Sequence, residues 1–209
     1  DHKDLSVTDF LGLVVDDEWL YRENKRRELR EKGARFKDKQ ATIESIDFSG
    51  KPRGITKSQV LEFAQLHWLH KKQNIAITGL TGVGKSWLAQ ALGAQACREG
   101  LKVLFLREPM LIHGLLTAKA TGGLPALLKR WAKIELLIVD DLGTATLGEE
   151  SRRDLLELVE ERNGIAATIV TSQLPVAEWH DHFGSGRVAD AICDRLLHFR
   201  FIDIGIQRL

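Results

Sequence analysis

The feature that most constrains this chain is a glycine-rich segment of eight residues that ends in lysine and serine. It reads Gly79-Leu80-Thr81-Gly82-Val83-Gly84-Lys85-Ser86 and matches the pattern G-x-x-x-x-G-K-[ST] at every fixed position. A short β-prone apolar run precedes it at residues 74–78, and apolar residues recur at helical spacing over residues 87–96. The strand, loop and helix that a phosphate-binding loop requires are therefore all present, whereas a chance glycine loop would lack this context.

Polyphosphate binding explains these residue types at this spacing. Glycines let backbone N–H groups approach phosphate oxygens without an obstructing Cβ, and the following helix adds the positive end of its dipole. Lys85 would reach the β- and γ-phosphates, and the Ser86 hydroxyl would ligate Mg²⁺. We therefore predict ATP and Mg²⁺ as cofactors. The predicted nucleotide contacts are Gly79, Leu80, Thr81, Gly82, Val83, Gly84, Lys85, Ser86 and Trp87.

Length and composition restrict the class of protein. A chain of 209 residues fits one ATPase core with a small appendage, and 44% apolar with 28% charged residues is typical of a soluble globular protein. No apolar run approaches the length of a membrane span, and the first residues lack a signal-peptide pattern. We expect a cytoplasmic protein without a membrane partner. Cys97 and Cys193 lack paired metal-ligand spacing, so we expect them to be buried free thiols.

The order of apolar patterns predicts an α/β fold, with a parallel sheet flanked by helices on both faces. Strands are expected at residues 74–78, 101–106, 135–141 and 166–173, and helices at residues 58–71, 87–98, 109–121, 124–133 and 151–163. Two helical segments, residues 5–15 and 19–32, precede a mixed-polarity linker at residues 36–53. We therefore divide the chain into a helical appendage with its linker, residues 1–50, and an ATPase domain, residues 51–209.

Two acidic residues, Asp140 and Asp141, end the most apolar predicted strand. Hydrolysis of a phosphoanhydride requires Mg²⁺ against the β- and γ-oxygens and a water aligned for attack. We assign Asp140 to Mg²⁺, usually through a coordinated water, and Asp141 to polarising the attacking water. The alternative is a solvated acidic loop after a strand.

Two further groups are candidates for contact with the γ-phosphate. Thr171, Ser172 and Gln173 form the polar tip of the next strand, where a hydroxyl or amide would sense the γ-phosphate or the water; ordinary turn residues are the alternative. Ser172 and Gln173 are among our candidate catalytic residues, and the choice within the tip is open. Arg195 is a candidate arginine finger for a neighbouring subunit, with an intramolecular salt bridge as the alternative. Arg187 and Arg208 are weaker candidates.

Together these motifs resemble the AAA+ proteins of the DnaA/DnaC clade, and most of the chain is similar to the IstB family, the ATP-dependent helpers of transposition in bacterial insertion sequences. The matching stretches are residues 17–24, 74–88, 136–143, 152–157, 171–180 and 189–196. Two departures stand out. Clade members often carry Glu where Asp141 stands, and residues 205–209 match the family's G-x-S-x-R ending only loosely.

The resemblance implies an ATPase that oligomerises on duplex DNA with nucleotide at subunit interfaces, selects or remodels target DNA, and recruits or stimulates a partner transposase. It also gives a reason for the excess of basic residues in residues 21–40, because duplex phosphates attract such a surface with little dependence on sequence. An ordinary solvated helix face is the alternative. The predicted DNA contacts are Arg22, Lys25, Arg26, Arg27, Arg30, Lys119, Arg130 and Lys133.

Two rival functions use the same phosphate-binding loop. A replicative-helicase loader of the DnaC type would share the ATPase core, but its appendage would contact a helicase rather than DNA. A small-molecule phosphotransferase would need a lid and an acceptor pocket, and the sequence has neither a lid arginine cluster nor a use for a basic appendage.

Overall fold

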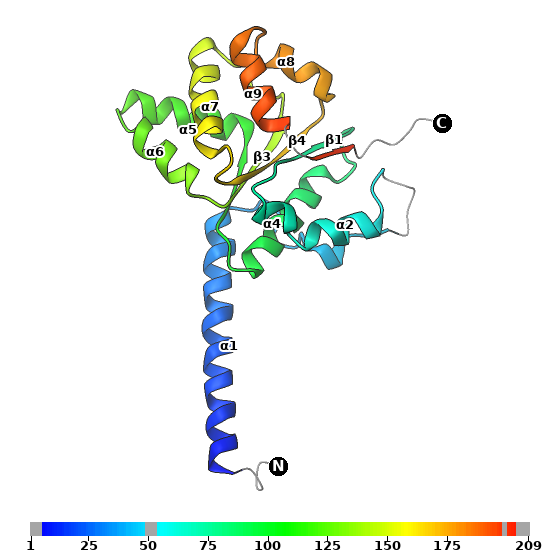
Figure 1. The fold of residues 1–209 in the computed structure, drawn as a ribbon, viewed down its shortest axis with the longest axis vertical. Helices are drawn as coiled ribbons and strands as arrows, with labels where there is room; N and C mark the ends of the chain where they lie inside the picture. The colour runs from blue at the N-terminus through cyan, green and yellow to red at the C-terminus, as the bar shows by residue number, and fades with distance from the viewer. Residues whose placement is uncertain (1–5, 49–53, 198–199, 204–209) are drawn as a thin grey trace.

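The computed structural model describes residues 6–48, 54–197 and 200–203. A parallel sheet of five strands, in the order β2-β3-β4-β1-β5, forms its centre (Figure 1). The strands are β1 (Ile75–Thr78), β2 (Val103–Arg107), β3 (Leu136–Leu142), β4 (Ala167–Ser172) and β5 (Arg200–Asp203). This confirms the predicted α/β class, and all four predicted strands are present. The fifth strand, β5, was not predicted.

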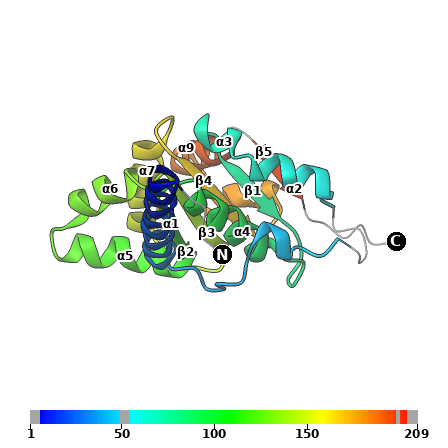
Figure 2. The ribbon, with the colours of Figure 1, turned by 90° about the horizontal axis from the view of Figure 1, so that it is seen from below.

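Helices cover both faces of the sheet (Figure 2). The chain order after the N-terminal segment is α2 (Lys57–Ala64), α3 (His67–His70), α4 (Lys85–Arg98), α5 (Glu108–Ala120), α6 (Leu124–Ala132), α7 (Glu149–Arg162), α8 (Trp179–His182) and α9 (Arg187–Leu197). Two short 3₁₀ turns are η1 (Ile43–Ser45) and η2 (Val176–Glu178). Alternate residues of each strand face opposite layers: Leu104 and Leu106 pack toward α5 to α9, and Val103 and Phe105 toward α4.

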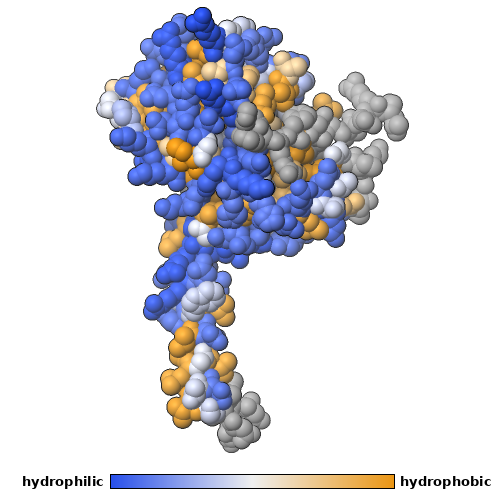
Figure 3. Space-filling model, viewed as in Figure 1, coloured by the Kyte–Doolittle hydropathy of each residue, from blue (hydrophilic) through white to orange (hydrophobic). Residues whose placement is uncertain are grey.

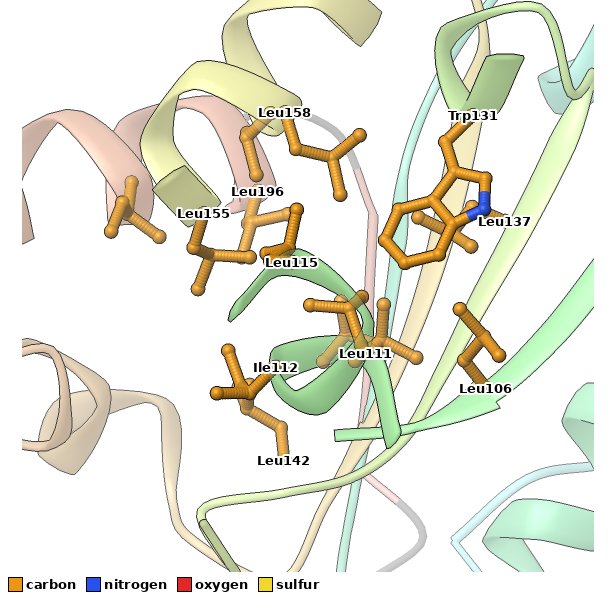
Figure 4. Close-up of a cluster of buried hydrophobic side chains, with 14 of the residues drawn as sticks. Leu106, Leu111, Ile112, Leu115, Trp131, Leu137, Leu142, Leu155, Leu158 and Leu196 are labelled. Carbon is orange, nitrogen blue, oxygen red and sulfur yellow. The ribbon is translucent and has the colours of Figure 1, made fainter. Parts of the chain in front are cut away.

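The layer formed by α5, α6, α7 and α9 contains a cluster of buried leucines (Figure 4). Leu106 and Leu137 from the sheet meet Leu111 from α5, Leu158 from α7 and Leu196 from α9. Full burial of one such side chain is worth roughly 1.5–3 kcal/mol relative to exposure. The cluster therefore fixes the start of α5 against the ends of β2 and β3, next to the predicted site.

The N-terminal segment is one continuous helix, α1 (Val7–Ala34), and not the two helices expected. A capping box between Ser6 and Asp9 starts it, and the left-handed Arg35 ends it, two residues beyond the predicted stop at Gly33. Its 28 residues correspond to a length of about 42 Å. Only the last turns pack on the body, so most of α1 projects away from it (Figure 1).

The projecting part of α1 exposes many large apolar side chains, and orange surface is visible along it in Figure 3. We call this surface, formed by residues 7–21, the apolar tip. Its large exposed side chains are Val7, Phe10, Leu11, Leu13, Val14, Val15, Trp19, Leu20 and Tyr21. Exposed apolar surface of this extent is typical of surfaces that contact other protein.

The segment expected to be a linker instead packs on α4. Ala34 and Ala41 are buried, the Phe36 ring lies against Gly93, and the Asp38 backbone N–H donates to Gln90 Oε1 at 2.9 Å. Residues 34–46 therefore belong structurally to the ATPase body. The predicted domain boundary at residue 50 lies outside the described residues.

The helix predicted at residues 58–71 is interrupted. Leu66 takes a left-handed conformation with φ 58° and separates α2 from α3, where its side chain is fully buried. Burial in the core therefore overrides helix propensity at this position. Among the helices of the described residues, none is both long and apolar enough to cross a membrane.

Candidate active site

The glycine-rich loop joins β1 to α4 as predicted, and its backbone geometry fits a bound polyphosphate. Gly82 and Gly84 have φ values of 82° and 97°, a region that favours glycine. Apart from each glycine and its two chain neighbours, no described residue has an atom within 4 Å of the position that a Cβ would take at either glycine. The loop backbone therefore lines open space, and the first N–H groups of α4, which begins at Lys85, add to the donors available there.

Lys85 lies under this loop and is 5% exposed. Its Nζ donates to the carbonyl oxygens of Gly79 at 2.9 Å and Leu80 at 2.8 Å. Burial lowers the pKa of Lys85, and the charges of Asp141 and Asp140 partly oppose this shift. The ammonium group is thus held at the loop and faces the two predicted acids electrostatically. Ser86 and Trp87, the next predicted contacts, are half-buried in the first turn of α4.

The two acids of β3 lie at an irregularity in the strand. Pairing with β4 shifts register between Val139 and Leu142, and Asp141 takes a left-handed conformation with φ 58°. Asp140 is 2% exposed, and its Oδ1 accepts the Thr171 hydroxyl at 2.6 Å. The Thr171 Oγ1 in turn accepts the backbone N–H of Asp141 at 3.0 Å. One hydroxyl from β4 therefore orients both acidic residues.

The Asp141 side chain is more open than that of Asp140. It lies 3.4 Å, through Oδ2, from Nε of Arg107 at the end of β2. Arg107 was not predicted as a site residue. An arginine at the end of an apolar strand is common, and nothing in the local sequence indicates that it pairs with Asp141.

The three residues at the polar tip of β4 make different contacts, and those of Thr171 are with the two acids. Ser172 is fully buried, donates its hydroxyl to the Leu142 carbonyl at 2.7 Å, and accepts the Leu174 N–H at 3.0 Å. These hydrogen bonds join the end of β3 to the loop that follows β4. The hydroxyl of Ser172 is therefore occupied within the chain, unlike a group that contacts nucleotide. Gln173 is exposed and accepts the Thr81 hydroxyl at 2.7 Å, which brings it against the phosphate-binding loop.

Arg195 on α9 makes intramolecular ion pairs, the alternative that the sequence left open. Its Nη1 lies 3.0 Å from Asp194 and its Nη2 lies 3.5 Å from Glu160, and 31% of the side chain remains exposed. Arg187 is exposed at the start of α9. Arg187 and Arg195 both line an open hollow of about 560 Å³. Arg208 lies outside the described residues.

The basic residues of α1 differ in exposure and in the partners that bind their charged groups. Arg22 and Arg26 are about two-thirds exposed and pair with glutamates of the same helix, as does the less exposed Arg27. The Lys25 ammonium lies over the Tyr21 ring. Arg30 is 17% exposed, bonds to Glu23 and donates from Nε to the Cys97 carbonyl at 2.9 Å. Arg30 therefore anchors α1 to α4.

The predicted DNA contacts outside α1, which are Lys119, Arg130 and Lys133, also differ in exposure and in their partners. The Lys119 ammonium donates to both oxygens of the buried Asp154, at 2.9 and 3.2 Å, and this hydrogen bond raises the pKa of Lys119. Its charge is thereby neutralised within the chain. Arg130 and Lys133, by contrast, are exposed at the end of α6.

A buried carboxylate beside the site was not predicted at all. Glu108, the first residue of α5, is 1% exposed and bonds to the loop after β3 and to His182. Within the described residues no cluster of three or more His, Cys, Asp or Glu side chains could hold a metal ion. A magnesium ion at Ser86 and Asp140 would therefore need phosphate oxygens and water as further ligands.

A phosphate-binding loop after β1, acids at the end of the adjacent-but-one strand β3, and a parallel sheet in this order define a P-loop ATPase fold of the AAA+ type. Two solved structures share this fold. The crystal structure of the DnaC helicase loader superposes with a TM-score of 0.66 at 19% identity, covering 79% of this chain and 97% of that chain. AMPPCP-bound DnaA from Aquifex aeolicus superposes with a TM-score of 0.67 at 18% identity, covering 81% of this chain and 51% of that chain.

The sequence comparison is more specific. Residues 1–205 match the family of IstB-like ATP-binding proteins, and the chain belongs to this family. A putative insertion sequence ATP-binding protein of Sinorhizobium fredii is 41% identical over 194 residues, which is 93% of this chain and 78% of that protein. The putative ATP-binding protein of insertion sequence IS21 from Pseudomonas aeruginosa is 35% identical over 196 residues, covering 94% and 73%. The predicted family is thus confirmed.

Proposed function

We propose that this chain is a bacterial, cytoplasmic ATPase that serves transposition. In this proposal it binds ATP with Mg²⁺, assembles on duplex DNA with nucleotide at subunit interfaces, selects or remodels the target, and recruits or stimulates a transposase. The observation that carries the proposal is the convergence of the phosphate-binding loop, Asp140 and Asp141 at one edge of the sheet. Membership in a family with relatives in insertion sequences supports the biological setting.

The residues divide the hydrolytic task between them. The loop N–H groups and Lys85 bind the phosphates. Ser86 and Asp140 would hold Mg²⁺, which would supply charge neutralisation there. Asp141 accepts a hydrogen bond from the attacking water and orients it. Gln173, beside Thr81, contacts the γ-phosphate or that water. Lys85 exchanges its two carbonyl partners for phosphate oxygens, and its charge balances the anion.

Assembly places a second chain beside α9. Arg195 there exchanges its pairs with Asp194 and Glu160 for the γ-phosphate of the neighbouring chain. The exchange is favourable because these pairs are partly exposed and therefore weak, while a phosphate offers more negative charge. The apolar tip of α1 offers a further contact for another protein, either the transposase or a second copy.

DNA binding falls on the basic residues of α1 and of the end of α6 that no buried group holds. These are Arg22, Lys25, Arg26 and Arg27 on α1, with Arg130 and Lys133 at the end of α6. Arg30 and Lys119 are not included, because Arg30 donates to the Cys97 carbonyl and Lys119 pairs with the buried Asp154, whereas Arg22, Arg26 and Arg27 pair only with glutamates of their own helix. Contacts of this kind bind phosphates and give affinity that falls steeply with salt and varies little with sequence.

The test is assembly of the full chain on duplex DNA. Analytical ultracentrifugation and electron microscopy with a non-hydrolysable ATP analogue should show a multimer on duplex DNA, and Lys85→Ala should prevent it. A chain that remains monomeric and unbound with saturating nucleotide and excess duplex would refute the proposal. Binding to a helicase without affinity for duplex DNA would favour the loader function instead.

A further inference from the structure

One buried carboxylate has no part in the roles assigned so far. Glu108 is 1% exposed and begins α5 directly after Arg107, the residue that pairs with Asp141. A carboxylate in such a place requires hydrogen-bond donors, because burial without them is costly. Its hydrogen-bond partners come from two segments distant in the sequence, and the first of them follows Asp141 directly in the chain.

The first segment is the loop that follows β3. The Oε2 atom of Glu108 accepts the backbone N–H groups of Gly143 at 2.9 Å, Thr144 at 2.9 Å and Ala145 at 2.8 Å. The Thr144 hydroxyl also donates to the Asp141 carbonyl at 2.8 Å. The carboxylate therefore fixes the backbone immediately after Asp141, and Thr144 extends this restraint to Asp141 itself.

The second segment is α8. His182 lies with Nε2 at 2.7 Å from the other carboxylate oxygen, Oε1, and its side chain is only 11% exposed. Phe183, fully buried, packs beside the imidazole with ring centroids 5.3 Å apart. The histidine ring is thus held in place and, through its contact with Oε1, keeps the carboxylate from rotating Oε2 away from the loop.

From these contacts we propose that Glu108 is a positioning residue for ATP hydrolysis, with His182 as the residue that orients it. The inference rests on the proposed ATPase function. Without the carboxylate, three adjacent N–H groups in a partly buried loop lose their acceptor and the loop must rearrange to reach water. A displacement of about 1 Å at the reacting groups can reduce a rate by about 100-fold. Nucleotide binding, by contrast, depends on the loop after β1, whereas the hydrogen bonds of Glu108 among the described residues go to the loop after β3 and to His182.

The experiment compares variants of the full chain in ATP binding and steady-state hydrolysis. Glu108→Ala should lower kcat at least tenfold and leave the Kd of a fluorescent ATP analogue within about twofold. Glu108→Gln should keep kcat within about threefold, because the amide oxygen accepts the same N–H groups. His182→Ala should give a smaller loss, about two- to fivefold. Amide hydrogen exchange of residues 143–145 should rise in Glu108→Ala and His182→Ala.

The matched control is Glu135→Ala. Glu135 also accepts a backbone N–H, that of Lys102 at 2.7 Å, but at the opposite end of β3. The kcat of Glu135→Ala should equal that of the wild type. A loss of kcat in Glu108→Ala alone then reflects positioning and not a general loss of stability.

Three results would overturn the inference: unchanged kcat in Glu108→Ala, equal losses in Glu108→Ala and Glu135→Ala, or a loss in Glu108→Gln as large as in Glu108→Ala. If Glu108→Ala does not fold, Glu108→Asp replaces it, because its shorter carboxylate cannot reach the loop; wild-type kcat in Glu108→Asp and His182→Ala would then overturn it. A wild-type chain with no ATPase activity would remove the proposed function itself, and this inference with it.

Discussion

Thr171 provides the sharpest test of how the acidic residues are held. It was expected as one of three candidates for sensing nucleotide, but its hydroxyl is fully buried and bridges the two acids. It donates to Asp140 Oδ1 at 2.6 Å and accepts the Asp141 N–H at 3.0 Å. Thr171→Val keeps the shape of the side chain and removes both hydrogen bonds.

The expected loss of stability follows from the two bonds. A hydrogen bond to a charged group contributes about 1.5–3 kcal/mol, and a buried N–H left without an acceptor costs about 1–3 kcal/mol. Burying a methyl group in place of the hydroxyl offsets part of this, at about 0.8 kcal/mol per carbon. We expect Thr171→Val to lower the free energy of unfolding by about 2–5 kcal/mol. Because Asp140 and Asp141 also lose their common anchor, kcat for ATP should fall about tenfold or more.

The assay is urea unfolding followed by tryptophan fluorescence, which the fully buried Trp179 makes sensitive to the fold. Thr171→Ser is the matched control, since it keeps the hydroxyl and loses only a methyl group, at about 1 kcal/mol. Equal stability of the Val and Ser variants would refute the reasoning, because the hydroxyl would then contribute nothing. Wild-type kcat in Thr171→Val would refute its role at the site.

Three further predictions concern separate parts of the molecule. Burial raises the pKa of the Cys97 thiol from 9.0 to about 12. Above pH 9 the thiol is therefore ionised in the unfolded chain and protonated in the folded chain, so the free energy of unfolding should fall by about 1.4 kcal/mol per pH unit. Urea unfolding between pH 8 and 10.5 should show this slope, and Cys97→Ala should flatten it. Arg195→Ala should bind ATP but lose hydrolysis, and mixing it with Asp141→Asn should restore part of the activity; no restoration would favour the ion pairs as its only role. Charge reversal at Lys25 and Arg26 should weaken binding about equally for all duplex sequences and reduce its salt dependence, whereas a sequence-selective loss in filter binding would contradict phosphate recognition.

The parts of the fold that the sequence predicted are those with a local signal. The glycine-rich loop, the apolar strand that ends in acids, and the helices that begin after Gly84 and Gly123 each follow from short patterns. The break at Leu66 has no such pattern, because a leucine with positive φ is fixed only by what surrounds it. The short strand β5 is likewise defined by its pairing with β1, not by its own composition.

The site shows the same division. Lys85, Asp140 and Asp141 were predicted because the chemistry of phosphate transfer fixes their residue types and spacing. Glu108 and His182 were missed because they meet each other and the loop after β3 only when separate segments fold together. Pro109 indicates only the start of a helix, and Glu108 is its first residue. Nothing in the local sequence distinguishes a carboxylate that only lies in the first turn of a helix from one that also holds a neighbouring loop.

The backbone at Asp141 changes the meaning of its short side chain. By length alone, Asp in place of the Glu that clade members often carry would slow hydrolysis, because the carboxylate reaches less far. However, Asp141 has a left-handed backbone with φ 58°, within a register shift of β3 against β4. Asp tolerates this conformation better than most residues with a Cβ, and a bulge redirects a side chain as well as extending the strand. Reach at this position therefore depends on the bulge and on the residues that hold it, Thr171 on one side and the loop bonded to Glu108 on the other. Side-chain length alone is a poor guide to the rate when the backbone that carries it differs.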